Sequence, residues 1–133
     1  MTPEEFLDLA CKLALDHEER MVNEEQFHPI LLERGLSAIE IESLTVTLAA
    51  RHKIERLPFV GGSADFEISK PAFMDYVLRT LPEGTVNKGL ELCKTWGQRG
   101  GREVNAQLLA TELSLSPFIA GILFECCVNR LRN

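Results

Sequence analysis

The spacing of apolar residues predicts that most of this chain is helical. Phe6, Leu9 and Leu13 recur every three to four residues, the period that gives an α-helix one buried face. The same period returns in further segments, each beginning at or after a polar residue that can cap a helix. The predicted helix starts are Thr2, Asn23, Ser37, Ser69, Thr85, Asn105 and Ser116. The first helix is expected to reach about Glu19, and Gly35 is expected to end the second.

The period changes after His52. Residues 54–59 form a short extended segment, residues 61–63 are the glycine-rich turn Gly-Gly-Ser, and residues 66–68 alternate between apolar and polar. Extended segments on both sides of such a turn are the signal of a β-hairpin. The predicted fold class is therefore mainly α with one small β-hairpin, near residues 54–69.

Three helices followed directly by a hairpin is the element order of a winged helix. Residues 4–69 resemble a winged helix-turn-helix domain, with the helix-turn-helix in residues 31–54. Residues 85–131 resemble the same superfamily through a pattern of apolar and capping residues. That pattern consists of Leu109, Ala110, Leu113, Leu115, Ser116, Ile119 and Leu123. Only two residues follow Leu131, so we expect no hairpin wing in this second stretch.

This resemblance implies a tandem winged-helix-like architecture in three parts. A winged-helix-like unit spans residues 1–69, a connector helix spans 70–84, and a wingless helix-turn-helix unit spans 85–133. Members of the superfamily bind DNA, RNA or other proteins, so the fold leaves the function open. The function is therefore inferred from the side chains of the two candidate recognition helices.

The first candidate recognition helix, residues 37–50, is a poor reader of DNA. Base edges and phosphates are bound by Arg, Lys, Asn, Gln or Ser side chains. This helix carries Glu40 and Glu42 instead, and cations follow only at its end, at Arg51 and Lys53. Its expected buried residues are Ile39, Ile41, Leu44 and Leu48, and its expected exposed residues include Ser43, Thr45 and Thr47.

The second candidate recognition helix, residues 117–131, offers aromatic rings where a DNA reader has polar groups. Its predicted partner-binding residues are Phe118, Gly121, Phe124 and Glu125. The residues expected to face the core are Ile119, Ile122, Leu123 and Cys126. Two interpretations stay open: the two rings complete the core, or they form an apolar contact surface for another protein or a second copy. The second interpretation predicts that at least one ring is substantially exposed.

Charge divides the chain into unequal halves. The composition is that of a globular protein, 45% hydrophobic and 26% charged, with a net charge of −6. Residues 1–69 hold 14 acidic and 6 basic side chains, a net −8, while residues 70–133 hold 6 and 8, a net +2. The basic residues of the second half are either a solvated surface or a nucleic-acid-binding patch. The candidate patch is Lys88, Lys94, Arg99, Arg102, Arg130 and Arg132.

No catalytic or metal-binding pattern is recognisable in the sequence. The four cysteines form no CxxC pair, so we expect buried structural thiols, and the three histidines lie far apart. Paired carboxylates such as Glu24 and Glu25 lie at helix ends, where solvated capping charges are usual. We therefore expect no enzyme activity, no cofactor and no metal. The N-terminus lacks the features of a signal peptide and no apolar run is long enough to span a bilayer, which favours a cytoplasmic protein.

Together these patterns favour a non-enzymatic adaptor or regulator that binds another protein or a second copy of itself, through the C-terminal helix and the acidic first unit. The alternative is a DNA-binding transcriptional regulator that acts as a dimer. Nucleic acid is the less favoured partner, and no membrane contact is expected.

Overall fold

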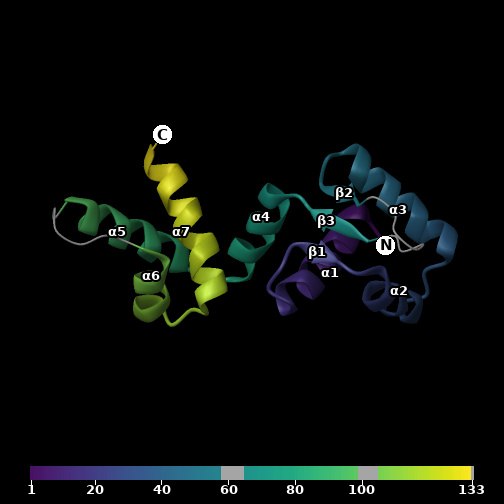
Figure 1. Ribbon diagram of the computed structural model, residues 1–133, viewed down its shortest axis with the longest axis horizontal. Helices are drawn as coiled ribbons and strands as arrows, with labels where there is room; N and C mark the ends of the chain where they lie inside the picture. The colour runs from purple at the N-terminus through teal and green to yellow at the C-terminus, as the bar shows by residue number, and fades with distance from the viewer. Residues whose placement is uncertain (58–64, 99–104, 133) are drawn as a thin grey trace. The chain divides into compact units, whose positions relative to one another are not determined.

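The computed structural model describes residues 1–57, 65–98 and 105–132 (Figure 1). In these residues the chain is mostly helical, with a small three-stranded antiparallel sheet, so the predicted fold class is confirmed. The chain forms two compact units, Met1–Tyr76 and Val77–Asn133, called unit 1 and unit 2 below. The division between them falls inside one helix, α4 (Lys70–Thr80), within the stretch where the sequence predicts a connector.

Unit 1 begins with three helices that the sequence predicts, joined by short turns. Its elements before α4 are α1 (Pro3–Asp16), β1 (Met21–Val22), α2 (Glu24–Glu33), α3 (Ala38–Ala50), β2 (Ile54–Arg56) and β3 (Phe66–Ile68). The predicted caps are confirmed, because the side chains of Thr2, Asn23 and Ser37 each accept a hydrogen bond from a backbone N–H of the first helical turn. The predicted end of α2 is confirmed by Gly35, whose φ is +84°. Helix α1 ends at Asp16, earlier than the expected Glu19.

The sheet of unit 1 has the strand order β1-β3-β2. Strand β3 pairs with β2 in the predicted hairpin, with Ile54 opposite Ile68, while the predicted turn at residues 61–63 lies outside the described residues. Strand β1 pairs with the other edge of β3 and was not predicted, because two residues are too few to show an alternating pattern. Arg20, just before β1, links this end of the strand to β3. Its guanidinium lies 3.1 Å from the carboxylate of Glu67 and donates to the carbonyl of Ile68.

An aromatic cluster forms the centre of unit 1. The ring of Phe27 on α2 packs edge-on against Phe6 of α1 and Phe66 of β3, with ring centroids 5.2 Å and 6.0 Å apart. All three rings are buried, and such edge-to-face pairs add about 0.5–1.5 kcal/mol each beyond the burial of their area. These contacts join α1 and α2 to the sheet through the Phe27 ring, and α3 in turn contacts α1 and β2.

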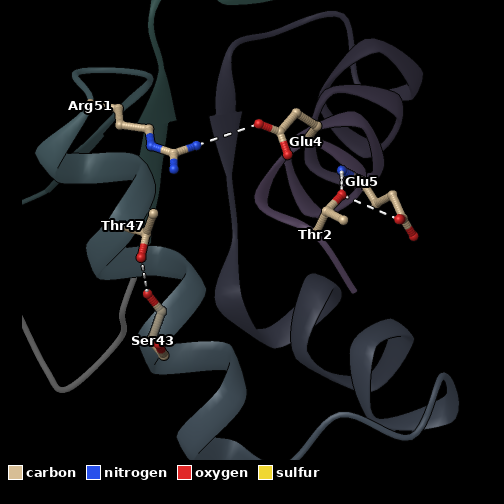
Figure 2. A network of polar contacts seen from close by, with 6 residues as sticks. All are labelled: Thr2, Glu4, Glu5, Ser43, Thr47 and Arg51. Atoms are coloured by element: carbon tan, nitrogen blue, oxygen red, sulfur yellow. Dashed lines mark hydrogen bonds and ion pairs between the residues drawn. The ribbon is translucent and has the colours of Figure 1, made fainter.

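Figure 2 shows polar contacts at the start of α1, within α3 and just after the end of α3. Thr2 accepts from the backbone N–H of Glu5 at the start of α1, and its hydroxyl lies 3.2 Å from the Glu5 carboxylate. The guanidinium of Arg51, just after α3, lies 3.4 Å from the carboxylate of Glu4. Within α3 the hydroxyl of Thr47 donates to the backbone carbonyl of Ser43, so that hydroxyl is satisfied locally. The exposed ion pair adds little stability.

The described residues of unit 2 form helices joined by short turns. After the end of α4 it contains α5 (Thr85–Gln98), α6 (Ala106–Leu113) and α7 (Pro117–Arg132). Helices α5 and α7 approach closely at Gly89, where an added Cβ would lie 3.2 Å from Leu123 Cδ2 and 3.3 Å from Cys127 Sγ. The predicted caps of α6 and α7 are confirmed, since Asn105 and Ser116 accept from the backbone N–H groups of Leu108 and Ile119.

The buried residues of α7 are shifted by about one position along the sequence from those expected to be buried. Its fully buried residues are Ala120, Leu123 and Cys127, with Cys126 close to fully buried, whereas Ile119 and Ile122 are half-buried. The expected stripe counted only large apolar residues, so it passed over Ala120. A small residue at that position permits close helix packing, and Ala120 belongs to the core cluster of unit 2 with Leu109 and Cys93.

Candidate protein-docking surface

Helix α3 buries a stripe of one polar and three apolar residues. Leu48 is buried, Ile41 and Leu44 are half-buried, and Thr45 is only 6% exposed. The hydroxyl of Thr45 donates to the carbonyl of Ile41 at 2.8 Å, which removes most of the cost of burying it. The expectation that Thr45 is exposed is therefore wrong. The four residues have the spacing i, i+3, i+4, i+7 of one buried helix face. The pattern includes Thr45 only if a threonine whose hydroxyl bonds within its own helix is counted among residues that can be buried.

Two apolar residues of α3 lie outside this buried stripe and point to solvent. Ile39 is 82% exposed and Val46 is 50% exposed. They are seven residues apart, so they lie within about 20° of one another around the helix axis. The expectation that Ile39 is buried is wrong because the inward stripe is set by Ile41 and Leu48, and Ile39 does not belong to it. A single exposed apolar residue is common on protein surfaces, but two on the same side of one helix offer a candidate contact surface for a partner.

The helices around this face carry mainly negative charge, with Arg56 of β2 as a cation beside Glu42. Helices α2 and α3 contain five glutamates and no lysine or arginine within their bounds. Each of these two helices is followed by an arginine at its C-cap, Arg34 and Arg51, and Arg51 is paired with Glu4. One of the glutamates, Glu40, completes the capping box of α3 with Ser37. A phosphate backbone would be repelled from this surface, in line with the interpretation of the sequence.

A cavity of about 230 Å³ lies beside the exposed face of α3. Its apolar lining includes the three aromatic rings of the core, Phe6, Phe27 and Phe66, and α3 contributes Ala38, Ile41, Glu42 and Thr45. Charged and polar groups surround it: Glu24, His28, Glu42 and Arg56 also line the cavity. The carboxylate of Glu42 lies 2.6 Å from the guanidinium of Arg56 on β2.

Glu42 joins the cavity to the exposed apolar pair. At about 100° per residue, Ile39 and Val46 lie about 40–60° from Glu42 on one side of the α3 axis. The other residues of α3 that line the cavity lie on the opposite side of Glu42, up to about 100° away. The apolar pair, Glu42 and the cavity therefore form one continuous surface, which we call the docking surface. The sequence pattern does not indicate this surface, because Ile39 is expected there to be buried.

The predicted partner-binding residues of α7 are placed differently. Phe118, Gly121, Phe124 and Glu125 are all half-buried, so the expectation of a substantially exposed ring is wrong. Phe124 packs against the core cluster of unit 2, because it lies next to Leu123 and Cys127 on the buried side of the helix. Gly121 has open space where a side chain would be. Phe124 therefore contributes to packing, and whether any of this set binds a partner stays a prediction.

The predicted basic patch is spread around two helices. Lys88 and Lys94 of α5 and Arg130 and Arg132 of α7 are exposed, while Arg99 and Arg102 lie outside the described residues. Six residues separate the two lysines, which places them about 120° apart around the α5 axis. The two arginines lie about 160° apart around α7. The described cations therefore form no single stripe along either helix.

The four cysteines are buried, as predicted. Burial is the main cause that raises the pKa of Cys127 to about 12, and the nearby thiol of Cys93 raises it further. Burial also raises the pKa of Cys93, which forms a hydrogen bond with Cys127. The thiols of Cys93 and Cys127 therefore stay protonated at neutral pH. A protonated thiol is a poor nucleophile and a poor metal ligand. Within the described ranges, no three His, Cys, Asp or Glu side chains are grouped as they would be around a metal ion.

In the part of the chain that the structure describes, no single helix has both the length and the apolar character needed to cross a membrane. Helices α6 and α7 pass that test only as a pair, and the break between them bends the pair by 114°. No protein-family model matches the chain, and no curated protein and no solved structure is significantly similar to it.

Proposed function

We propose that this protein is a non-enzymatic adaptor or regulator built on winged-helix-like units, and that it binds another protein through the docking surface of unit 1. One observation carries the proposal: Ile39 is 82% exposed on the outer side of α3, the same side as exposed Val46, in a helix whose only charged residues are glutamates. When a partner covers an exposed apolar side chain, the complex is stabilised by roughly 25 cal/mol per Å² of apolar surface removed from water.

The order and pairing of elements in unit 1 support the winged-helix part of the proposal. Helix, strand, two helices and a hairpin follow one another, and β1 pairs with the far edge of the hairpin. In the resemblance drawn from the sequence, α3 stands in the place of the recognition helix. Its side chains suit a protein partner better than a nucleic acid, because the helix has no cation within its bounds.

The alternative is a DNA-binding regulator that acts as a dimer. It requires the basic residues of unit 2 to act together, and Lys88, Lys94, Arg130 and Arg132 are the described candidates. Their positions around α5 and α7 weaken this alternative. A cytoplasmic location and the absence of enzyme activity belong to the same proposal.

The test compares binding to protein and to DNA. Intact chain is immobilised and exposed to native lysate, and separately to nonspecific duplex DNA at about 50 mM salt, where phosphate binders hold tightly. The matched variants are Ile39→Asp and Leu131→Asp, which place the same charge at two exposed apolar sites, Leu131 being 47% exposed on α7. We expect a protein that is captured by wild type and by Leu131→Asp and lost by Ile39→Asp, with the DNA unretained. Retention of DNA together with capture that is equal for all three chains would contradict the proposal.

A further inference from the structure

We infer that the docking surface binds a basic amphipathic helix of another protein, and that one large apolar side chain of that helix enters the cavity between α2, α3 and β3. This inference rests on the proposed function and adds the chemistry of the partner. Three features of unit 1 carry it: the charge of α2 and α3, the size and lining of the cavity, and the spacing of the exposed apolar pair.

Charge complementarity selects a basic partner. The five glutamates of α2 and α3 have no lysine or arginine among them, and residues 1–69 as a whole carry a net charge of −8, from 14 acidic and 6 basic side chains. Glu42 has Arg56 as a neighbour at 2.6 Å, but both side chains are substantially exposed, 59% and 41%. Exposed pairs of this kind are weak, so a partner's lysine or arginine can share the carboxylate. Complementary charge of this sort raises the association rate and excludes acidic competitors.

The cavity fits a side chain better than a metabolite. Its volume of about 230 Å³ lies below the roughly 300–1,000 Å³ that small-molecule sites usually have. Phe6, Phe27 and Phe66 line it with aromatic carbon, and Ala38, a small exposed residue, also lines it. A leucine, phenylalanine or tryptophan side chain can be buried there as an anchor, which is how helical peptides gain most of their affinity.

The spacing of the apolar pair suits a helix laid across α3. Ile39 and Val46 are two helical turns apart, roughly 10 Å along the axis at about 1.5 Å per residue. A bound amphipathic helix presents its own apolar residues at i, i+3, i+4 and i+7 over a similar length. One such residue can enter the cavity while its neighbours cover Ile39 and Val46.

A second copy of this chain fits the surface less well. In a symmetric dimer the same patch meets itself, so the α2 and α3 glutamates of one copy would face those of the other. Like charges brought together in this way oppose association. The partner that the surface fits is therefore a different chain with the opposite charge.

The experiment is an unbiased selection of peptides on the intact chain. A displayed library of random peptides, each about five helical turns long, is selected on wild type, and the enriched peptides are then measured by fluorescence anisotropy against three variants. Ile39→Asp removes the apolar contact and adds a carboxylate, so a loss of affinity for a cationic peptide cannot be electrostatic. Ala38→Leu fills the mouth of the cavity without removing any apolar atom. Leu131→Asp in unit 2 is the matched charge control.

We expect enriched peptides with net positive charge and apolar residues at helical spacing. Ile39→Asp and Ala38→Leu should each weaken them by about tenfold or more, and Leu131→Asp should leave the affinity within twofold. Raising the salt should weaken binding, as for any exposed charge pairing. Circular dichroism of each variant checks that the fold is kept.

The outcomes separate this inference from the proposed function. Enrichment of neutral or acidic peptides that still depend on Ile39 overturns the basic-helix inference and leaves protein binding in place. Enriched peptides that bind Ile39→Asp as tightly as wild type overturn the assignment of the site. A concentration-dependent dimer that is lost in Ile39→Asp would show that a second copy is the occupant, and would also overturn the inference. If no peptide is enriched and the chain retains duplex DNA, the inference and the proposed function fail together.

Discussion

Gly89 offers the sharpest test of how α5 and α7 pack in unit 2. Replacing glycine by alanine inside a helix normally stabilises it by about 1 kcal/mol, because alanine has less backbone freedom to lose. At Gly89 the added methyl would lie 3.2 Å from Leu123 Cδ2 and 3.3 Å from Cys127 Sγ. Both neighbours are fully buried and have little room to withdraw. Crowding of this kind in a packed core costs about 1–3 kcal/mol.

The expected net effect of Gly89→Ala is therefore between no change and a loss of about 2 kcal/mol in the free energy of unfolding of unit 2. Gly121→Ala is the matched control, since nothing lies within 4 Å of its added Cβ. That variant should gain about 0.5–1 kcal/mol. Hydrogen exchange of the α5 and α7 amides measures the local free energy in both variants without averaging over unit 1. Equal stabilisation by the two substitutions would refute the close approach of the helices at Gly89.

Three further substitutions test the core, the thiols and a cap. Cys127→Ala should reduce the loss of stability that the wild type shows at alkaline pH. The pKa of the Cys127 thiol is about 12 in the folded state and 9.0 ordinarily, so between these pH values the unfolded state loses its proton first. The free energy of unfolding of the wild type then falls by as much as about 1.4 kcal/mol per pH unit, which urea titrations from about pH 8 to 11 measure. Phe124→Ser should cost about 1–3 kcal/mol, because the half-buried ring packs against the unit 2 core; thermal unfolding that matches wild type would place the ring outside the core. Ser37→Ala should cost about 1 kcal/mol by removing the capping box of α3, and Ser37→Thr should recover most of it in the same denaturation assay.

Local signals in the sequence predict the helix starts well. Thr2, Ser37 and Asn105 are recognisable because each satisfies backbone N–H groups within its own first turn, which needs no information from the rest of the fold. The hairpin is predictable for a similar reason, since alternation and a glycine-rich turn are both local. Strand β1 is different: Met21–Val22 is extended because it pairs with β3, more than forty residues later in the chain.

The face that a helix buries is harder to predict than the helix itself. In α3 the polar Thr45 can be buried because its hydroxyl donates to the carbonyl of Ile41. The apolar Ile39 is exposed because it lies outside the inward stripe that contains Thr45. In α7 the small Ala120 is buried in preference to larger neighbours, because α7 must approach other helices closely. Both cases depend on packing partners that the sequence pattern does not identify. The docking surface follows from the first of these reversals, because it requires Ile39 to be exposed.

Site-specific crosslinking on α3 tests the central claim most directly. A photo-crosslinking amino acid is placed at Ser43, an exposed residue that neighbours both Ile39 and Val46 on the helix surface, so that neither apolar residue is removed. The same amino acid at Leu131 of α7 is the control. After irradiation in native lysate we expect a discrete protein adduct from position 43 that is absent from position 131 and disappears when Ile39→Asp is added. Adducts with nucleic acid at position 43, or protein adducts that form equally at both positions, would contradict the assignment of α3 as a protein-binding helix.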